Sequence, residues 1–314
     1  MMRLEYQIAA AMILDLALGD PRWLPHPVRL IGNTAIFLEK TWRRLVENEY
    51  LAGLATTLSV LAATGLATVA LLRGAALLHP YAETACSIFL IYTSIAVTDL
   101  ARHAQAVYEA LARQDLALAR QRVGMIVGRD PSVLDESGVA RATVESVAES
   151  MVDGVTAPLF FAFVGGPLGA MLYKAVNTMD STFGYKNERY QRFGWTPAKL
   201  DDLANLLPAR ITGLLVPLAA LLAGMDYQNS WKIFRRDRLN HASPNSAHTE
   251  AGVAGALGVQ LGGSNIYFGK TVTKPFIGDP FTPITAAHIP AANRLLFLTT
   301  LLAAALGLTL RALV

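Results

Sequence analysis

The sequence predicts an all-α polytopic membrane protein with about four to six membrane segments, some of them broken or re-entrant. Hydrophobic residues make up 53% of its 314 residues and charged residues only 16%, whereas soluble domains carry about 25% charged residues. The mean hydropathy is +0.36. A helix needs roughly 20 apolar residues to cross a bilayer, so residues 51–72, 82–98 and 294–313 are predicted to span it.

Three other apolar stretches are less regular. The first, near residues 6–18, is short, and without a small-x-small cleavage site it is expected to be a retained helix rather than a signal peptide. Residues 211–225 are also short and contain Pro217. Residues 155–173 carry Gly-Gly-Pro at their centre, which leaves backbone groups unpaired. A helical hairpin or a broken helix is therefore favoured there over a simple span.

Four polar segments separate the apolar ones and hold nearly all the charged residues: 19–50, 99–154, 174–205 and 226–293. Counting crossings places the first three on one face if 155–173 is re-entrant, and the fourth joins them if 211–225 does not cross. Most Lys and Arg lie on that face, which predicts a multi-pass protein of the inner (plasma) membrane with a cytoplasmic active site. With no repeat or linker, one membrane enzyme domain, 1–314, is expected.

Several functional classes are excluded. The net charge is only +3, with no block of like charge and no aromatic-rich basic stretch, so no nucleic-acid partner is expected. The single cysteine, Cys86, rules out an internal disulfide framework and a Cys-based zinc site. The sequence contains no P-loop, Gly-x-Gly-x-x-Gly, His-Glu-x-x-His or Gly-x-Ser-x-Gly motif.

A stripe of carboxylates is the first candidate for chemistry. Glu145, Glu149 and Asp153 recur every four residues, on one face of a predicted helix. Like charges at this spacing are unfavourable unless cations lie between them, and Mg²⁺ binds carboxylate oxygens together with substrate phosphates. The alternative is a solvated face neutralised by Arg141 and other basic residues.

The densest polar cluster, residues 173–190, directly follows the broken apolar stretch. Lys174 and Asn177 are spaced to share a helix face, and Asp180 follows them. Polar groups at the end of a membrane helix are unfavourable unless they are used, so a functional interpretation is the default for this cluster.

Two further segments have equally simple structural explanations. Asp20, His26 and Arg29 lie on a stretch that prolines make stiff, but the same stretch fits an interfacial turn anchored by a Trp. Asp201 and Asp202 are typical of acidic pairs that hold Mg²⁺ on phosphorylated substrates. Adjacent residues on a helix point in different directions, however, so the pair alone is a weak indication.

The last polar segment runs from Arg235 through a Ser-Pro-Asn turn at residues 243–245 to Glu250. Glycines at 252, 255 and 258 follow. They permit close approach of a ligand, but they fit helix packing in a membrane bundle equally well.

These segments together resemble a known family. In chain order the sequence contains GDPRWLPHPVRLIG, VGRD, RATVESVAESMVDG, APLF, YKAVNTMDSTFGYKNERY, LDDLANLLPARIT, RRD, HASPNS and EAGVAGALGVQLGG. Over residues 15–269 the series closely resembles the adenosylcobinamide-phosphate synthases (the CobD/CbiB type). The resemblance implies a carbon–nitrogen ligase that uses ATP and Mg²⁺ in late cobalamin biosynthesis. It would join the propionate carboxylate of adenosylcobyric acid, a corrinoid, to (R)-1-aminopropan-2-ol phosphate.

The implied reaction needs acid–base groups, cations for phosphate, and carboxylates for Mg²⁺, and motif positions supply each type. The candidate catalytic residues are His26, Glu145, Lys174, Asp180 and His241. The candidates for binding substrate and phosphate are Arg29, Arg129, Asn177, Lys186, Asn187, Arg189, Arg210, Arg235, Ser243 and Asn245. The candidate Mg²⁺ ligands are Glu149, Asp153, Asp201 and Asp202. The resemblance itself transfers no individual role.

The chain departs from the family pattern at two places. Ser150 stands where an Asn is usual, which weakens a side-chain ligand there. Residues 246–249 replace a Gly followed by an aromatic residue and Pro, which reshapes a substrate-facing turn. Neither departure removes a charged motif residue.

The rival hypotheses are a corrinoid transporter or binding protein, and a scaffold for other cobalamin enzymes. Broken helices favour a transporter, but the sequence shows no inverted repeat and its charge lies outside the spans. A scaffold would not require such dense polar clusters. The expected partners are the lipid bilayer, the corrinoid and amino-alcohol phosphate substrates, other cobalamin enzymes, and a second copy in a homo-oligomer.

Overall fold

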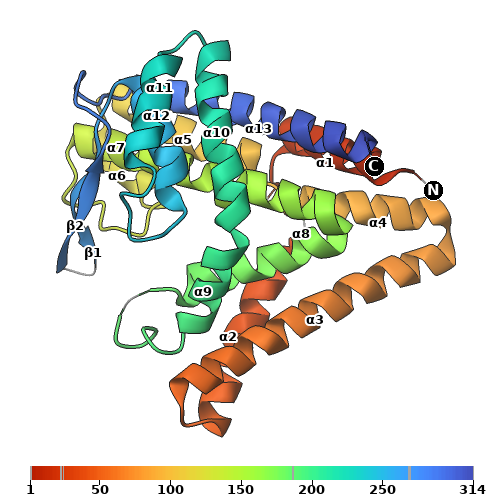
Figure 1. Ribbon diagram of the computed structural model, residues 1–314. Coiled ribbons are helices and arrows are strands. Elements are labelled where there is room, and N and C mark those ends of the chain that lie inside the picture. Colours follow the sequence, from red (N-terminus) through yellow and green to blue (C-terminus); the bar gives the residue numbers. More distant parts are fainter. Residues whose placement is uncertain (1, 22, 24, 186, 268–269, 314) are drawn as a thin grey trace. The chain divides into compact units, whose positions relative to one another are not determined.

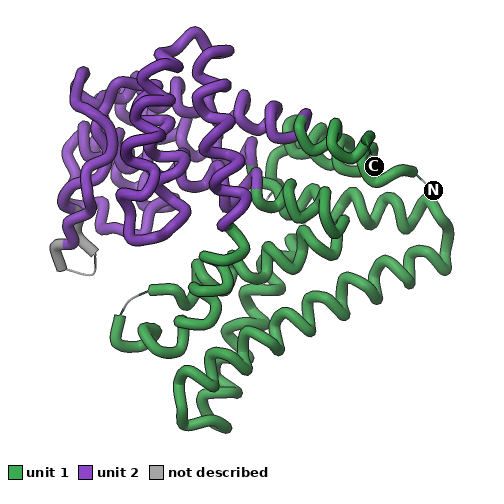
Figure 2. The backbone as a smooth tube through the Cα atoms, viewed as in Figure 1, with its two compact units in different colours: residues 1–96, 157–205, 306–314 green, residues 97–156, 206–305 purple. Residues whose placement is uncertain are grey.

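The computed structural model describes residues 2–21, 23, 25–185, 187–267 and 270–313. The chain divides into two compact units, each assembled from separate stretches of sequence (Figure 2). Unit 1 comprises Met1–Ala96, Ala157–Asn205 and Leu306–Val314, and unit 2 comprises Val97–Thr156 and Leu206–Ala305. Neither unit is a continuous half of the chain, and the expectation of one domain stays a prediction.

Unit 1 is helical. Its helices are α1 (Leu4–Leu18), α2 (Pro27–Leu45), α3 (Glu49–Leu78), α4 (Pro80–Tyr92), α8 (Ala157–Phe183) and α9 (Trp195–Ala204) (Figure 1). Small side chains such as Ala35, Ala52 and Ala175 let α2, α3 and α8 approach closely around the larger Met179 and Phe183. This packing fixes the C-terminal half of α8, which carries the predicted Lys174–Asp180 cluster.

Unit 2 combines helices with one β-hairpin. Its helices are α5 (Val97–Ala112), α6 (Leu116–Val123), α7 (Glu136–Met151), the π-helix η1 (Val152–Thr156), α10 (Leu206–Leu222), α11 (Tyr227–Asp237), α12 (Ser246–Leu257) and most of α13 (His288–Ala312). The strands β1 (Leu261–Tyr267) and β2 (Lys270–Ile277) pair in antiparallel register. The all-α prediction is confirmed as the fold class, but it missed this hairpin.

Four helical stretches in the described residues are long and apolar enough to cross a membrane. They are Glu49–Leu78, Pro80–Ala112, Glu136–Phe183 and His288–Ala312, with a fifth if α9 and α10 count as one span. In α3 only 28% of the most apolar window is buried. Its exposed leucines need a hydrocarbon surrounding, which agrees with the membrane assignment. Helix α1, at 15 residues, is shorter than a full span.

Helix α8 is a hairpin rather than one rod, as the Gly-Gly-Pro predicted. Gly166 has φ 60° and ψ −151°, which ends one helical arm before Pro167 begins the next. The rings of Phe161 and Tyr173 stack with centroids 5.1 Å apart, although twelve residues of continuous helix would separate them by about 18 Å. The chain therefore folds back on itself within unit 1. Tyr173 lies on the second arm, at the start of the polar cluster of residues 173–190.

Close approach of the two arms gives a first prediction, that Gly169→Ala destabilises the protein by about 1–3 kcal/mol. A Cβ at this position would lie 2.4 Å from the backbone oxygen of Phe161, so the arms must separate. The matched control is Gly165→Ala, because nothing lies within 4 Å of a Cβ at that position. Thermal unfolding in detergent measures both, and equal melting temperatures for the two variants would contradict the hairpin packing.

Candidate functional site

Three carboxyl groups meet in unit 2 where α7 packs on α12, and we call them the carboxylate cluster: Glu145, Glu149 and Glu250. Glu145 and Glu149 are four residues apart on α7, so their side chains share a face. Ser246 and Glu250 are likewise four apart on α12. Ser246 Oγ donates to Glu149 Oε1 at 3.0 Å, which joins the two faces.

Glu145 has partners for both carboxylate oxygens. Arg129 Nη2 donates to Oε2, and the backbone N–H of Gly262 donates to Oε1 at 2.8 Å. Both side chains of the ion pair are buried, with 5% of the Arg129 side chain and 8% of the Glu145 side chain exposed. Two residues predicted for chemistry thus form a buried ion pair, which fastens α7 to the loop before it and to β1. This arrangement makes them positioning residues.

Glu250 is a member of the cluster that the sequence prediction did not include. It is buried, and burial raises its pKa well above the usual value, helped by the negative charges of Glu149 and Glu145. Burial therefore favours the protonated, neutral form of the Glu250 carboxyl group. A buried acid that favours its protonated form beside other carboxyl groups is typical of acid–base sites.

The protonation of Glu250 gives a second prediction. The folded state keeps a proton that the unfolded chain releases above about pH 4.3, so wild-type stability falls as pH rises, by up to about 1.4 kcal/mol per unit, until the folded pKa is reached. Glu250→Gln mimics the neutral acid and removes this slope. The gain in melting temperature of the variant over wild type should therefore grow as the pH rises above about 4.3, the pKa of an unfolded glutamate. A gain that is independent of pH would show that Glu250 is charged in the folded protein.

His241 lies beside this cluster, but neither of its ring nitrogens is free to act as a base. Its Nδ1 accepts a hydrogen bond from the Ser243 backbone N–H at 3.0 Å, which leaves the proton of the neutral ring on Nε2. Burial, followed by the positive charge of Lys274, lowers the pKa of His241, so the ring is neutral. The Nε2 atom is buried without a hydrogen-bond partner among the described residues. His241 therefore offers a buried N–H donor.

The turn before α12 carries the other predicted residues of unit 2. Ser243 Oγ accepts from the Asn245 backbone N–H at 3.3 Å, so this serine shapes the turn. Arg210 Nη1 reaches Asn245 Oδ1 at 3.5 Å, and Arg235 is exposed on α11. Asp153 lies in η1, because α7 ends at Met151. The prediction that Asp153 stacks under Glu149 assumed that the α-helix continues to residue 153, but α7 ends at Met151.

In unit 1, hydrogen bonds connect the second arm of α8 to α9. Tyr173 Oη donates to Asn205 Oδ1, and Asn205 Nδ2 donates to Asp201 Oδ2, both at 2.9 Å. Asn177 Nδ2 contacts Asp201 Oδ1 at 3.5 Å. Asp202 instead pairs with Lys199 at 3.1 Å. The neighbouring acids point to different partners, and Asp201 has a structural role.

The half-buried Lys174, Asn177 and Asp180 all lie on this second arm. Lys174 and Asn177, three residues apart, are neighbours on the helix surface as the sequence predicted, and Asn177 and Asp180 are spaced in the same way. The structure thus retains them as one local group in unit 1.

Two predicted residues near the chain turns of unit 1, His26 and Asn187, have structural partners. His26 caps α2: its Nδ1 accepts from the Val28 N–H at 3.3 Å, and its Nε2 lies 3.3 Å from Asp20 Oδ2. Asn187 Oδ1 accepts from the Tyr190 N–H at 2.9 Å.

Arg189 pairs with the buried Glu39 at 3.1 Å, 150 residues away in sequence. Arg43 bonds the same Glu39 oxygen, so the carboxylate is shared by two guanidinium groups that the motif analysis did not connect. Arg29 is exposed on α2. The predicted Lys186 lies outside the described residues.

No group of three or more His, Cys, Asp or Glu side chains in the described ranges is arranged to hold a metal ion. Of the four predicted Mg²⁺ ligands, Glu149 and Asp153 belong to unit 2, and Asp201 and Asp202 to unit 1. Mg²⁺ commonly binds one or two carboxylates together with substrate phosphates and water. A single carboxylate of unit 2 fits that mode, whereas a cage built from protein ligands alone does not fit the described residues.

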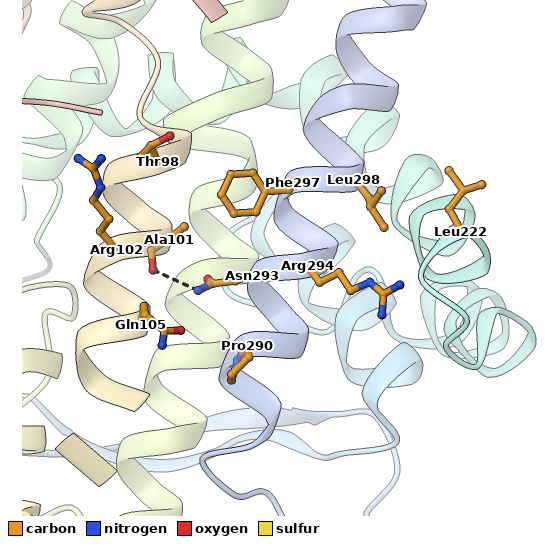
Figure 3. A pocket seen from close by; sticks show the side chains of 10 residues that line it. All are labelled: Thr98, Ala101, Arg102, Gln105, Leu222, Pro290, Asn293, Arg294, Phe297 and Leu298. Carbon is orange, nitrogen blue, oxygen red and sulfur yellow. Dashed lines mark hydrogen bonds between the residues drawn. The ribbon is translucent and has the colours of Figure 1, made fainter. Parts of the chain in front are cut away.

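A cavity of about 600 Å³ in unit 2 is lined by residues of α5, α10 and α13 (Figure 3). Asn293 points from α13 to α5 and donates through Nδ2 to the Ala101 oxygen at 3.1 Å. Arg294 extends towards Leu222 of α10. None of the predicted site residues lines this cavity, so it is separate from the candidate site.

The chain is similar to known proteins over most of its length. The profile of the family described as CobD/Cbib protein matches residues 8–296. A protein named cobalamin biosynthesis protein CobD, from Geobacter metallireducens, is 51% identical over 290 residues, which cover 92% of this chain and 91% of the relative. Proteins of the same name from Leptospira interrogans (47%, 95% of each chain) and Listeria monocytogenes (43%, 94% of each chain) are also similar. No solved structure matches.

Proposed function

The chain belongs to the CobD/CbiB family of cobalamin biosynthesis proteins, and on this basis we propose that it is an ATP-dependent, amide-forming ligase. Its proposed substrates are adenosylcobyric acid and (R)-1-aminopropan-2-ol phosphate. The proposed location is the inner membrane, with the site on the cytoplasmic side. The observation that carries the proposal is the carboxylate cluster, in which a neutral Glu250 lies beside the carboxylates of Glu149 and Glu145.

The proposed reaction has two steps. The substrate carboxylate oxygen attacks the γ-phosphorus of ATP, which forms an acyl phosphate and releases ADP. The amine then attacks the acyl carbon, so a C–N bond forms, the C–O bond to phosphate breaks, and inorganic phosphate leaves. The ammonium form of the amine must lose two protons on the way to the neutral amide, one before attack and one after.

Glu149 is the proposed base for the attacking amine. It is half-buried, and Ser246 orients one of its oxygens at 3.0 Å. Glu250, held neutral by burial, is the proposed hydrogen-bond donor to the acyl or phosphate oxygen on which negative charge develops. The buried Nε2–H of His241 adds a second donor. Arg129 acts through Glu145 and positions α7.

Bound with ATP, Mg²⁺ would neutralise phosphate charge, and Asp153, the other predicted Mg²⁺ ligand of unit 2, would supply a carboxylate to it. Lys174, Asn177 and Asp180 of unit 1 stay proposed substrate-binding and catalytic residues, on the strength of their dense polar grouping at the end of a membrane helix.

The test is an assay on detergent-purified protein with adenosylcobyric acid, the amine phosphate, ATP and Mg²⁺, followed by mass spectrometry. The expected result is one amide product per ATP consumed, and no product when ATP is left out. Lys174→Ala and Asp180→Ala variants, assayed beside wild type, test the unit 1 group. If the corrinoid binds but no amine or nucleotide yields an amide, the ligase proposal is wrong.

The second candidate function is corrinoid transport, which the α8 hairpin favours. Broken helices whose backbone is interrupted at membrane depth are typical of transporters, and Gly166 interrupts α8 in this way. Proteoliposomes separate the two functions, because a transporter moves corrinoid across the bilayer without ATP and without changing its mass.

A further inference from the structure

Helix α12 presents two different faces within unit 2. Ser246 and Glu250 face α7. His248 lies between them in sequence, and two residues rotate an α-helix by about 200°, so His248 points the other way. Gly252, four residues after His248, lies on its side: a Cβ there would come 2.8 Å from Val216 of α10. The second face of α12 therefore packs on α10 and α11.

A cavity of about 390 Å³ lies on this second face, and it is strongly cationic. We call it the arginine pocket, built by Arg210, Arg235, Arg238 and His248. No Asp or Glu is among the described residues that line it. Its remaining walls are apolar: Leu214, Trp231 and Phe234. Three guanidinium groups thus share one small space with no carboxylate to neutralise them.

The imidazole of His248 is the most informative group in this pocket. It is only 3% exposed, and neither ring nitrogen has a hydrogen-bond partner among the described residues. Burial, followed by the charges of Arg210 and Arg238, lowers its pKa to about 4, so the ring is neutral at physiological pH. A buried N–H donor left unpaired is unfavourable by roughly 1–3 kcal/mol. A ligand oxygen in the pocket would remove that penalty.

Two of the arginines are held in place without a ligand. Arg210 Nη1 donates to the Leu206 oxygen at 2.5 Å, and Arg238 Nη1 donates to the Arg235 oxygen at 2.6 Å. Arg238 also lies over the Phe234 ring, 5.8 Å from its centroid, and Trp231 stacks on the same ring. These contacts order the guanidinium groups in advance, which lowers the entropy lost on binding an anion.

We propose that the arginine pocket binds a phosphate group, supplied by a soluble phosphate ester or by a lipid headgroup. Three guanidinium groups match the charge and the several oxygens of a phosphate better than a single carboxylate. The His248 N–H donates to one of these oxygens, and the aromatic wall contacts the apolar part of the ligand. This pocket lies on the face of α12 opposite the carboxylate cluster. Arg210 and Arg235 are among the residues that the sequence predicted to bind substrate and phosphate, and the pocket adds Arg238 and the buried His248 to them.

Binding to the full-length protein tests the proposal directly. Titration calorimetry in detergent uses inorganic phosphate and pyrophosphate as soluble probes. Native mass spectrometry after extraction from phosphatidylglycerol or phosphatidylcholine nanodiscs probes the lipid source. Arg238→Gln should weaken phosphate binding about 10-fold or more, because hydrogen bonds to charged groups are the stronger class. Arg122→Gln, at an exposed arginine of α6, is the matched control and should bind as wild type does.

His248→Phe separates binding from folding. It keeps the ring but removes the unpaired nitrogens, so the melting temperature should stay level or rise while phosphate binding weakens. Saturable binding of soluble phosphates identifies a soluble ligand, and retention of phosphatidylglycerol alone identifies a lipid. The proposal is overturned if neither probe binds saturably, if His248→Phe and Arg238→Gln bind as wild type does, or if Arg122→Gln weakens binding equally.

Discussion

Replacing Glu149 by glutamine is expected to lower kcat for amide formation by about 10²–10⁴-fold, the contribution of a general base. The glutamine cannot accept the proton of the substrate ammonium. Its Oε1 still accepts the hydrogen bond that Ser246 donates at 3.0 Å, so the fold should be retained. Steady-state rates at saturating amine, beside a melting curve, measure the effect.

The matched control for this variant is Glu136→Gln, at an exposed carboxylate in the first turn of the same helix. It should keep the wild-type rate. Equal rates for Glu149→Gln and wild type would remove Glu149 from the chemistry. Equal losses in the two variants would point instead to a general effect of charge on α7.

Replacing Arg129 by methionine is expected to destabilise the protein by about 3–5 kcal/mol. The substitution keeps much of the volume but leaves the Glu145 carboxylate buried at 6% exposure without its cation. Chemical denaturation in detergent, monitored by circular dichroism, measures the loss. The exposed Arg122→Met serves as control and should change stability by less than about 0.5 kcal/mol.

A second variant distinguishes the cost of the unpaired Glu145 charge from the loss of Arg129 packing. In the double variant Arg129→Met/Glu145→Gln neither residue of the pair is charged, and the glutamine Oε1 still accepts from the Gly262 N–H, as Glu145 Oε1 does at 2.8 Å. Most of the lost stability should return, since paired residues couple strongly. A double variant as unstable as the single one would show that Arg129 stabilises unit 2 by packing alone.

Membrane character and the broken α8 followed from local chemistry and were predicted from the sequence. The length of an apolar run can be read from the sequence and compared with the length that crosses a bilayer. Gly-Gly-Pro interrupts any helix that contains it. The β1–β2 hairpin was missed because its first strand begins at Leu261, directly after Gly252, Gly255 and Gly258, which were interpreted as helix packing or ligand approach. Strand pairing depends on partners that the local pattern does not identify.

In the candidate site too, residues marked by local spacing were predicted, and residues that depend on distant contacts were missed. Glu145 and Glu149 were found because helical spacing is visible in sequence. Glu250 was missed because its importance comes from contact with α7, about 100 residues earlier in the chain. Its spacing from Ser246 was the available signal. The pairing of Arg189 with Glu39 was equally hidden, since it joins residues 150 positions apart.

The fate of labelled oxygen tests ATP-dependent ligation most directly. With ¹⁸O in the propionate carboxylate of adenosylcobyric acid, attack on the γ-phosphorus predicts one ¹⁸O atom in the inorganic phosphate for each amide formed. Mass spectrometry of phosphate and amide from one reaction mixture measures both. Amide formation with unlabelled phosphate, or ATP hydrolysis and corrinoid binding without any amide, would contradict the proposed function.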